Sequence, residues 1–295
     1  MIPPAVHERN ADQATYWNGP GGRHWTERQA MQDALLAPVS KRLIAAAHTM
    51  AGERVIDIGC GCGATTLEFA AITGSAGRAL GVDLSGPMIE RARERAAQET
   101  SPAEFLMADA TVHDFSFERA DLLTSRFGVM FFADPALSFA NMRRGLKPGG
   151  RLVFVCWREP RLNPWLTLPL KAATRHAPRL PEVGPEDPGP FSFAQEARVR
   201  RILTASGFTD IALAPDDLEL DVAVGLGLEN AIASALEIGP ASRALEGQPE
   251  AIRQAATAEI RAALEPHRRG MSVPLGAAIW IVSARVDGRP PGPSL

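Results

Sequence analysis

The feature that most constrains the fold of this chain is a short apolar run that contains an acid and leads into a glycine-rich turn. Residues 55–63 read Val-Ile-Asp-Ile-Gly-Cys-Gly-Cys-Gly. The apolar part is typical of a buried strand. Glycine allows the turn to be tight and lets a ligand contact bare backbone at the start of the following helix. This order predicts a ligand site at the end of a buried strand.

Around this unit, predicted helices and strands alternate from about residue 30 to residue 157. We expect strands at 54–58, 78–82, 104–107, 120–124 and 151–157, and helices at 29–50, 64–72, 85–98 and from about 134. Residues 147–150, Lys-Pro-Gly-Gly, are typical of a turn. Such alternation builds a mostly parallel sheet with helices on both faces. With two later strands, within 209–222 and at 277–286, the fold class is α/β, a Rossmann-like seven-stranded sheet.

The second half of the chain has a different pattern. Residues 158–190 hold eight prolines, which predict an ordered excursion without regular helix or central strand. A helix is expected at 194–206, and residues 226–268 should form two helices, interrupted by prolines. We therefore expect one domain. Its parts are an N-terminal lid segment and first helix (1–50), a ligand-binding core (51–157), a proline-rich lid insertion (158–190), the rest of the sheet (191–286) with a helical lid insertion (226–268), and a disordered tail (287–295).

Composition excludes several classes of function. The chain has 295 residues and a net charge of −3, so it offers no overall basic field for a nucleic acid. Three cysteines, two of them inside the glycine turn, form no disulfide framework and indicate a reducing compartment. No apolar run approaches the roughly 20 residues of a membrane span. We expect a cytoplasmic protein without a membrane or nucleic-acid partner.

Acids follow two further strands of the predicted sheet. Asp83 ends the second strand, where a carboxylate can accept hydrogen bonds from both ribose hydroxyls of a nucleoside. Asp109 follows the third strand, and a simple loop cap is the alternative role. The spacing Gly59-x-Gly61-x-x-Ala64 also fits the dinucleotide-binding fingerprint. Asp57 argues against that reading, because an acid there suits a cationic ligand and would repel a pyrophosphate.

The acid followed by G-x-G-x-G resembles motif I of the class I S-adenosylmethionine-dependent methyltransferases. The resemblance extends over residues 54–157 and is closest to small-molecule bacterial enzymes of the UbiE-like kind. It implies S-adenosylmethionine as cofactor and S-adenosylhomocysteine as product, with the glycine loop against the amino acid part, Asp83 on the ribose and Asp109 near the adenine. The cofactor-binding residues that it implies are Asp57, Gly59, Cys60, Gly61, Gly63, Asp83, Leu84, Met88, Asp109, Ala110 and Ser125.

Residues 125–132 follow the fourth strand, where class I enzymes place residues next to the transferred methyl group. Arg126 and Phe131 are therefore candidates for substrate binding, although a surface ion pair and a core position explain them equally well. Trp25 and Trp157 are expected as further walls of the acceptor pocket. The Asn/Asp-Pro-Pro-aromatic sequence with which base methyltransferases grip a flipped base is absent from this position.

The segment 16–25 contains the only tyrosine and two of five tryptophans. It is similar to the leading segment of UbiE-like enzymes, which folds over the cofactor, and a hydrophobic anchor is the open alternative. It also holds His24, which, with Arg126, is a candidate catalytic residue. Cys60 and Cys62 lack the further ligands of a metal site, so no metal is expected.

The expected function is methyl transfer to a small-molecule acceptor by in-line displacement in a covered pocket, in a monomer or a homodimer. Two rival functions remain open at this stage. One is an NAD(P)-dependent oxidoreductase, and the other is a noncatalytic sensor of S-adenosylmethionine or S-adenosylhomocysteine.

Overall fold

The computed structural model of the protein describes residues 5–181, 184 and 186–288. A seven-stranded sheet has the order β3-β2-β1-β4-β5-β7-β6. Strand β7 is antiparallel to both of its neighbours, β5 and β6. The pairs β1–β2, β1–β4, β2–β3 and β4–β5 are parallel. The predicted α/β class and the mostly parallel sheet are thus confirmed. The strands are β1 (Arg54–Ile58), β2 (Arg78–Asp83), β3 (Glu104–Met107), β4 (Ala120–Arg126), β5 (Leu146–Trp157), β6 (Thr209–Asp221) and β7 (Pro274–Arg285).

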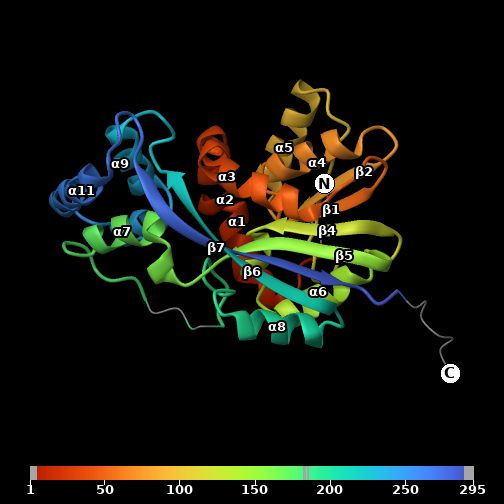
Figure 1. Ribbon diagram of the computed structural model, residues 1–295. Helices are drawn as coiled ribbons and strands as arrows, with labels where there is room; N and C mark the ends of the chain where they lie inside the picture. Colours follow the sequence, from red (N-terminus) through yellow and green to blue (C-terminus); the bar gives the residue numbers. More distant parts are fainter. Residues whose placement is uncertain (1–4, 182–183, 185, 289–295) are drawn as a thin grey trace.

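Helices cover both faces of the sheet, and a further group lies beyond its carboxyl edge (Figure 1). The α-helices are α1 (Ala11–Asn18), α2 (Pro20–Glu27), α3 (Gln29–Ala47), α4 (Ala64–Thr73), α5 (Gly86–Gln98), α6 (Pro135–Arg143), α7 (Pro164–Ala173), α8 (Glu196–Ala205), α9 (Leu228–Glu237), α10 (Pro240–Leu245) and α11 (Glu250–Leu264). In Figure 1, α3, α4 and α5 lie on one face, and α6 and α8 lie on the other. Helices α7, α9 and α11 gather at one end, beside the extended β6 and β7.

The proline-rich excursion was expected to contain no regular helix, and that expectation is wrong. Helix α7 lies inside it, with Pro164 in its first turn and Pro169 in its interior. Pro164 needs no helical hydrogen bond there, because the first N–H groups of a helix have no partner within it. Pro169 is buried, so the packing around it offsets the one hydrogen bond that its missing N–H cannot donate.

Other boundaries also differ from the expectations. The stretch 226–268 forms three α-helices rather than two, because Pro240 starts the short helix α10. Helix α3 ends at Ala47 and not at the expected Met50, since His48 already adopts the left-handed conformation, with φ of 47°. The predicted turn 147–150 is a bulge within β5, where Gly149 has φ of 76° and the pairing with β4 shifts register. Of the predicted disordered tail, residues 289–295 lie outside the described residues.

The two long strands β6 and β7 connect the sheet to the end where α7, α9 and α11 lie. They pair in antiparallel register from Thr209–Arg285 to Asp221–Pro274. Pro215 lies in β6, at the edge of the sheet, where a missing N–H costs no ladder hydrogen bond on the open side. Among the described residues, no helix has both the length and the apolar character that a membrane span requires.

Candidate cofactor and acceptor site

The glycine loop joins β1 to α4 through three residues with positive φ. Gly59, Gly61 and Gly63 have φ of 65°, 55° and 84°. Residues other than glycine rarely adopt this backbone conformation. The loop is tied to the next strand, because the N–H groups of Gly59 and Cys60 both donate to the carbonyl oxygen of Val82, at 2.8 and 3.2 Å. This part of the backbone is therefore held in place by hydrogen bonds to β2.

The three glycines serve different purposes. A Cβ on Gly59 would lie 2.6 Å from Cα of Gly128, so the loops after β1 and β4 approach backbone to backbone. A Cβ on Gly63 would lie 2.7 Å from the ring of Phe105, which makes Gly63 a packing position. At Gly61 a Cβ would be in ordinary van der Waals contact with Met88 and Trp25, at 3.7 and 3.8 Å. Of the three glycines, only Gly61 would accept a Cβ without a close contact, and it also lines the cavity described below.

Asp83 lies at the carboxyl end of β2, directly beside this loop. Its Oδ2 accepts a hydrogen bond from the N–H of Gly61 at 2.8 Å, and its Oδ1 accepts one from the N–H of Ser85 at 2.9 Å. Burial raises the pKa of the carboxyl, and these backbone hydrogen bonds oppose that shift. Each oxygen has a further lone pair for a ligand hydroxyl. The position fits the expected contact with a ribose.

Asp57 is enclosed behind the loop. Its Oδ2 accepts hydrogen bonds from the hydroxyls of Thr65 and Thr66, at 2.6 and 2.7 Å, while its Oδ1 is buried without a hydrogen-bond partner among the described residues. Burial raises the pKa of Asp57 to about 6; the two threonines and Arg126 oppose the shift, and Asp83 adds to it. Asp57 therefore holds the start of α4 against β1.

Asp109 lies after β3 and is bonded to the N-terminal segment of the chain. Its oxygens accept hydrogen bonds from Nδ2 of Asn10, at 3.0 Å to each, and from the N–H groups of His7 and Thr111, at 2.9 and 2.8 Å. Asn10 is itself buried and also accepts a hydrogen bond from the N–H of Ala133. Through these hydrogen bonds, Asp109 holds the segment before α1 over the carboxyl ends of the strands.

A cavity of about 510 Å³ lies at the carboxyl edge of the sheet, within the range of roughly 300–1,000 Å³ typical of ligand pockets. It is bordered by α1, α2 and α3, by the loops after β1 to β5, and by α7, α9, α10 and α11. The cofactor and acceptor candidates that line it are His24, Trp25, Gly59, Cys60, Gly61, Asp83, Leu84, Met88, Asp109, Ala110, Arg126, Phe131 and Trp157.

Three candidates do not line this cavity. They are Asp57, Gly63 and Ser125, of which Ser125 is fully buried and accepts a hydrogen bond from the N–H of Val129 at 3.3 Å. All three lie one layer behind the cavity wall. Their direct contact with a cofactor stays a prediction, and in this structure they support the loops that form the wall.

Two groups of aromatic side chains line the cavity. In the first, the ring of Trp157 stacks on Phe127, with centroids 4.0 Å apart, and packs against Trp165 of α7, with centroids 4.9 Å apart. In the second, the ring of Trp17 packs edge to face with Trp25 and Phe131, with centroids 6.3 and 5.3 Å apart. Phe127 holds a positive φ of 70°, a strained conformation of the kind that accumulates at functional sites.

Arg126 is the last residue of β4 and is nearly enclosed, with 10% of its side chain exposed. Its Nη1 donates to Oγ of Ser40 at 2.7 Å, and its Nη2 lies 4.0 Å from Oδ1 of Asp33. Burial lowers the pKa of this guanidinium, and the nearby acids oppose that effect. The alternative of a surface ion pair is therefore wrong for Arg126.

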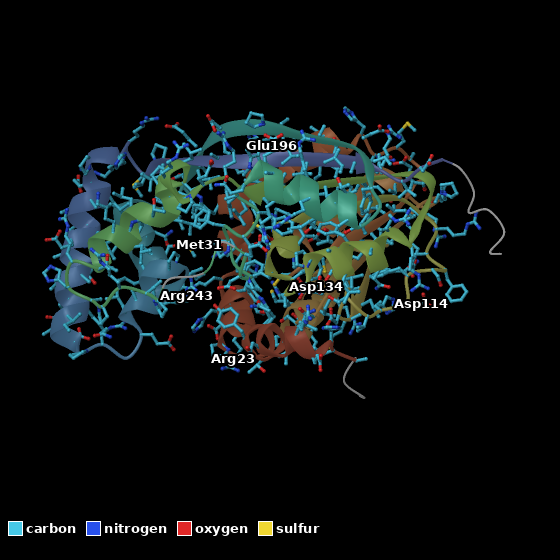
Figure 2. All side chains as sticks on the ribbon, turned by 90° about the horizontal axis from the view of Figure 1, so that it is seen from below. Arg23, Met31, Asp114, Asp134, Glu196 and Arg243 are labelled. Carbon is cyan, nitrogen blue, oxygen red and sulfur yellow. The ribbon has the colours of Figure 1, made fainter. Side chains whose placement is uncertain are left out.

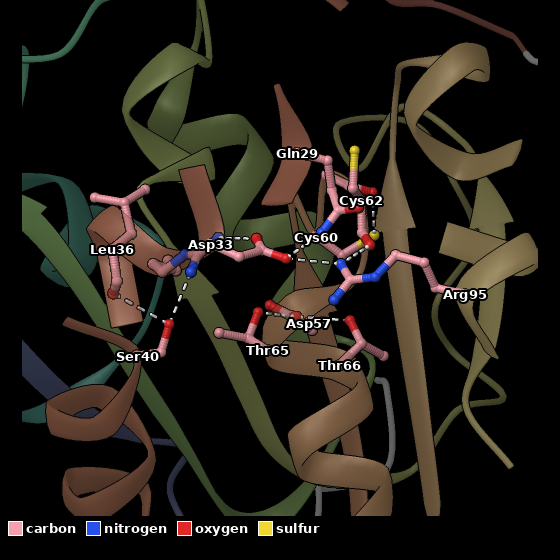
Figure 3. Close-up of polar contacts among 12 residues, drawn as sticks. Gln29, Asp33, Leu36, Ser40, Asp57, Cys60, Cys62, Thr65, Thr66 and Arg95 are labelled. Atoms are coloured by element: carbon pink, nitrogen blue, oxygen red, sulfur yellow. Dashed lines mark hydrogen bonds and ion pairs between the residues drawn. The ribbon is translucent and has the colours of Figure 1, made fainter. Parts of the chain in front are cut away.

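Figure 3 shows the polar network around Asp33 and Ser40, to which Arg126 is joined by its hydrogen bond to Ser40. Asp33 lies 3.0 Å from Nη1 of Arg95, and the same nitrogen donates to the carbonyl oxygen of Cys62 at 2.6 Å. The side-chain amide of Gln29 donates to Asp33 at 2.6 Å. Helix α3 is thus connected to the glycine loop through α5. Figure 2 labels Met31, also in α3, whose sulfur lies 3.9 Å from the side-chain amide of Asn230 in α9.

Neither the histidine nor the cysteines gain a catalytic partner from the fold. His24 is exposed on α2 where it borders the cavity, and no hydrogen bond joins its side chain to another described residue. Cys60 and Cys62 are buried, and burial raises the pKa of both thiols, to about 11 for Cys62. The two cysteines pack as neutral side chains.

Sequence reasoning missed a large part of the cavity wall. Asn10 and Gln32 lie in helical segments whose pattern carried no ligand signal, and Leu166, Ser242 and Arg243 come from the proline-interrupted second half. Only the position of the long insertions, between strands of the sheet, could have indicated that they face its carboxyl edge. Their individual side chains carried no such information.

Comparison with known proteins finds matches to the central part of the chain. Residues 55–150 match the family model described as a methyltransferase domain. The match covers about a third of the chain. The chain is similar to the aklanonic acid methyltransferase DauC of Streptomyces sp. (strain C5), 34% identical over 118 residues, which are 40% of this chain and 54% of DauC. It is also similar to the ubiquinone/menaquinone biosynthesis C-methyltransferase UbiE of Geotalea daltonii, 34% identical over 110 residues, 37% of this chain and 47% of UbiE. The matched segments span about half the length of these relatives.

Solved structures extend the likeness of the fold beyond the methyltransferase domain. The YcgJ protein of Bacillus subtilis aligns with a TM-score of 0.55 at 16% identity, covering 84% of this chain and 97% of YcgJ. The [4+2]-cyclase SpnF aligns with a TM-score of 0.52 at 15% identity, covering 90% of this chain and 94% of SpnF. At such identity the likeness concerns the fold alone.

Proposed function

We propose that this chain transfers a methyl group from S-adenosylmethionine to a small-molecule acceptor enclosed between the sheet and a lid. The observation that carries the proposal is the continuity of one cavity. It joins Gly61 and Asp83, the positions expected to hold the cofactor, to an aromatic compartment lined by Trp157 and Trp165. One cavity of about 510 Å³ thus offers both a nucleoside site and an apolar site.

The residues at the first end fit an adenosyl cofactor. Gly61 lines the cavity with bare backbone, and Asp83 presents carboxylate oxygens with free lone pairs beside it. Met88 lies next to Gly61 and offers an apolar, adaptable surface. We assign the amino acid part to the glycine loop, the ribose to Asp83, and the adenine to the region of Asp109 and Ala110.

When bound, S-adenosylmethionine supplies a methyl group on a sulfonium, and in-line displacement by a lone pair of the acceptor leaves S-adenosylhomocysteine. The protein contributes positioning and exclusion of water. Trp25, Phe131 and Trp157 would form the walls that orient the acceptor. His24 borders the cavity and is placed to accept a proton where the acceptor is a hydroxyl or a protonated amine.

The proposed lid combines segments that lie far apart along the chain. We assign it to α1 and α2, to the excursion that contains α7, and to α9–α11, because residues of all three segments line the cavity. An ion pair between Arg28, just before α3, and Glu237 at the end of α9 joins two of them. A lid of this size suits a metabolite and would obstruct a folded protein or a duplex.

The fold leaves the reaction open, because SpnF, named as a cyclase, has a similar fold. Titration calorimetry with S-adenosylhomocysteine and with NAD(P) separates the cofactor classes, and we expect binding of the first alone. Incubation with methyl-labelled S-adenosylmethionine and a panel of phenols, enols, amines and thiols then tests transfer. Tight binding without labelling of any acceptor would favour a sensor, and labelling of tRNA or protein would contradict the small-molecule assignment.

A further inference from the structure

Arg126 is a buried cation whose hydrogen-bonding capacity is largely unused. A guanidinium has five N–H donors. Among the described residues, Arg126 makes one hydrogen bond, from Nη1 to Ser40, and its Nη2 lies beyond hydrogen-bond distance of Asp33. Buried donors are nearly always satisfied. Since Arg126 lines the cavity, its remaining donors are available to a ligand with acceptor oxygens.

The surroundings of Arg126 place it at the cofactor end of the cavity. The charged groups that face it are Asp33 on α3, Asp57 on β1, Glu68 on α4 and Arg95 on α5. These elements enclose the glycine loop, and Arg95 itself donates to the carbonyl oxygen of Cys62 in that loop. None of the four belongs to the lid helices α7 or α9–α11. Arg126 therefore adjoins the part of the site assigned to the amino acid portion of the cofactor.

The amino acid portion of the cofactor contains hydrogen-bond acceptors for the remaining donors of Arg126. The methionine part of S-adenosylmethionine ends in a carboxylate, whose two oxygens match the planar fork of a guanidinium. A carboxylate also offsets the proximity of the cationic Arg126 to the sulfonium and the ammonium group of the cofactor. We propose that Arg126, oriented by Ser40 and Asp33, binds the carboxylate of the cofactor. This assignment rests on the proposed function and replaces the role in acceptor binding expected for Arg126 from the sequence.

Asp33 and Ser40 act as positioning residues. Both project from α3, and Asp33 also holds Arg95 at 3.0 Å. One carboxylate therefore orients two guanidinium groups, one toward the loop backbone and one beside the cavity. Asp33→Asn should weaken binding of the carboxylate-bearing ligand, and Asp33→Glu should restore part of it.

The test compares two ligands that differ only in the carboxylate. Calorimetry is carried out with S-adenosylhomocysteine and with its decarboxylated analogue, which keeps the thioether and the amine. The wild-type protein should bind S-adenosylhomocysteine roughly 10- to 100-fold more tightly, the range expected for hydrogen bonds to a charged group. Arg126→Gln should bind both ligands alike, with the affinity for the analogue unchanged, which also shows that the variant is folded. Ser40→Ala should reduce the discrimination only in part.

The matched control is Arg42→Gln, an arginine of α3 that donates to the carbonyl oxygen of Pro38 in the same helix and is paired with Asp216 of β6. It should keep the full discrimination. If Arg126→Gln discriminates as the wild type does, the assignment is wrong; a raised KM for the acceptor in that variant would return Arg126 to the acceptor site. A wild-type protein that binds neither ligand would overturn the proposed function instead.

Discussion

The two parts of the cavity that we assign to the cofactor and to the lid, here called the cofactor half and the lid half, are built in opposite ways. The cofactor half uses residues at the ends of adjacent strands, such as Gly61 and Asp83, whose backbone and side-chain atoms bond to one another directly. The lid half uses side chains from α7, α9, α10 and α11, separated along the chain and joined mainly by packing and exposed ion pairs. The family match ends at residue 150, before the first of these helices.

This difference shows why a shared cofactor leaves a recognisable sequence and an acceptor does not. A ligand that contacts bare backbone requires glycine at fixed positions, because any side chain would occupy its place. An apolar wall can be made from many combinations of side chains at many positions. We therefore expect substitutions in the cofactor half to weaken cofactor binding strongly, and substitutions in the lid half to change acceptor preference gradually.

The largest effect should come from Gly59→Val. A Cβ there would lie 2.6 Å from Cα of Gly128 in a backbone with φ of 65°. We expect a loss of roughly 3–5 kcal/mol in the free energy of unfolding, from strain and overpacking together. Urea denaturation measures it. Gly74→Val is the control, since Gly74 has φ of 64° with no atom within 4 Å of its Cβ, and it isolates backbone strain from the clash. Equal losses in both variants would contradict the close approach of the two loops.

The next largest effect should be on the binding of S-adenosylhomocysteine, with the fold retained. Asp83→Ala should weaken the binding of S-adenosylhomocysteine by roughly 1.5–3 kcal/mol, because hydrogen bonds to a charged acceptor are lost. Gly61→Val should weaken it further, since its side chain would project toward Met88 and Trp25, into the space assigned to the ligand. Calorimetry on both variants tests this, with the unfolding midpoint as a check on the fold. Unchanged affinity in either variant would show that the cofactor end has been misassigned.

The buried acid behind the loop should make stability depend on pH. The pKa of Asp57 is raised to about 6 in the folded protein, mainly by burial, above the ordinary value of about 3.9 in an unfolded chain. The folded state therefore binds the proton more tightly, and this contribution to stability is fully present below about pH 4 and is lost as the pH rises through about 6. Urea midpoints between pH 4 and pH 7 should fall more steeply for the wild type than for Asp57→Asn. Parallel curves would contradict the raised pKa.

A substitution in the lid should change acceptor binding and leave cofactor binding nearly unchanged. Trp165→Ala removes the α7 side chain that touches Trp157, with ring centroids 4.9 Å apart. We expect the affinity for S-adenosylhomocysteine to stay within about threefold, while the KM for the acceptor rises about tenfold, the equivalent of about 1.4 kcal/mol. Steady-state kinetics with each substrate varied in turn measures the split. A matching fall in cofactor affinity would show that the two halves form one binding unit.

The smallest effect should come from the ion pair between Arg28 and Glu237. Both side chains are about 40% exposed, and exposed pairs contribute about 0.2–1 kcal/mol. Glu237→Gln should therefore speed the dissociation of S-adenosylhomocysteine by a small factor, and this difference should vanish in high salt. Stopped-flow dissociation at two salt concentrations checks it. A salt-independent change would mean that Glu237 acts through a contact other than the ion pair.

Local patterns predicted the central part of the fold because its secondary structure depends on residues that are close together in the sequence. The strand before Gly59, the helix capped by Ser85 and the acid at Asp83 each depend on a few neighbouring residues, and all three occur where expected. The prediction failed at α7 because proline composition was taken as evidence against a helix. Pro164 occupies the one turn that tolerates proline freely, and the burial of Pro169 depends on residues far away in the chain.

The sequence by itself determined the α/β class, the glycine loop and the acids at the ends of β2 and β3, because parallel strands bring their carboxyl ends to one edge. Only the tertiary structure decided what those acids contact. It paired Asp109 with Asn10, almost 100 positions away, enclosed Asp57 behind the loop, and left Arg126 beside Asp33 with unused donors. Hydrogen bonds between distant segments depend on how helices such as α1 and α3 dock, and docking is set by the packing of the whole core rather than by any local pattern.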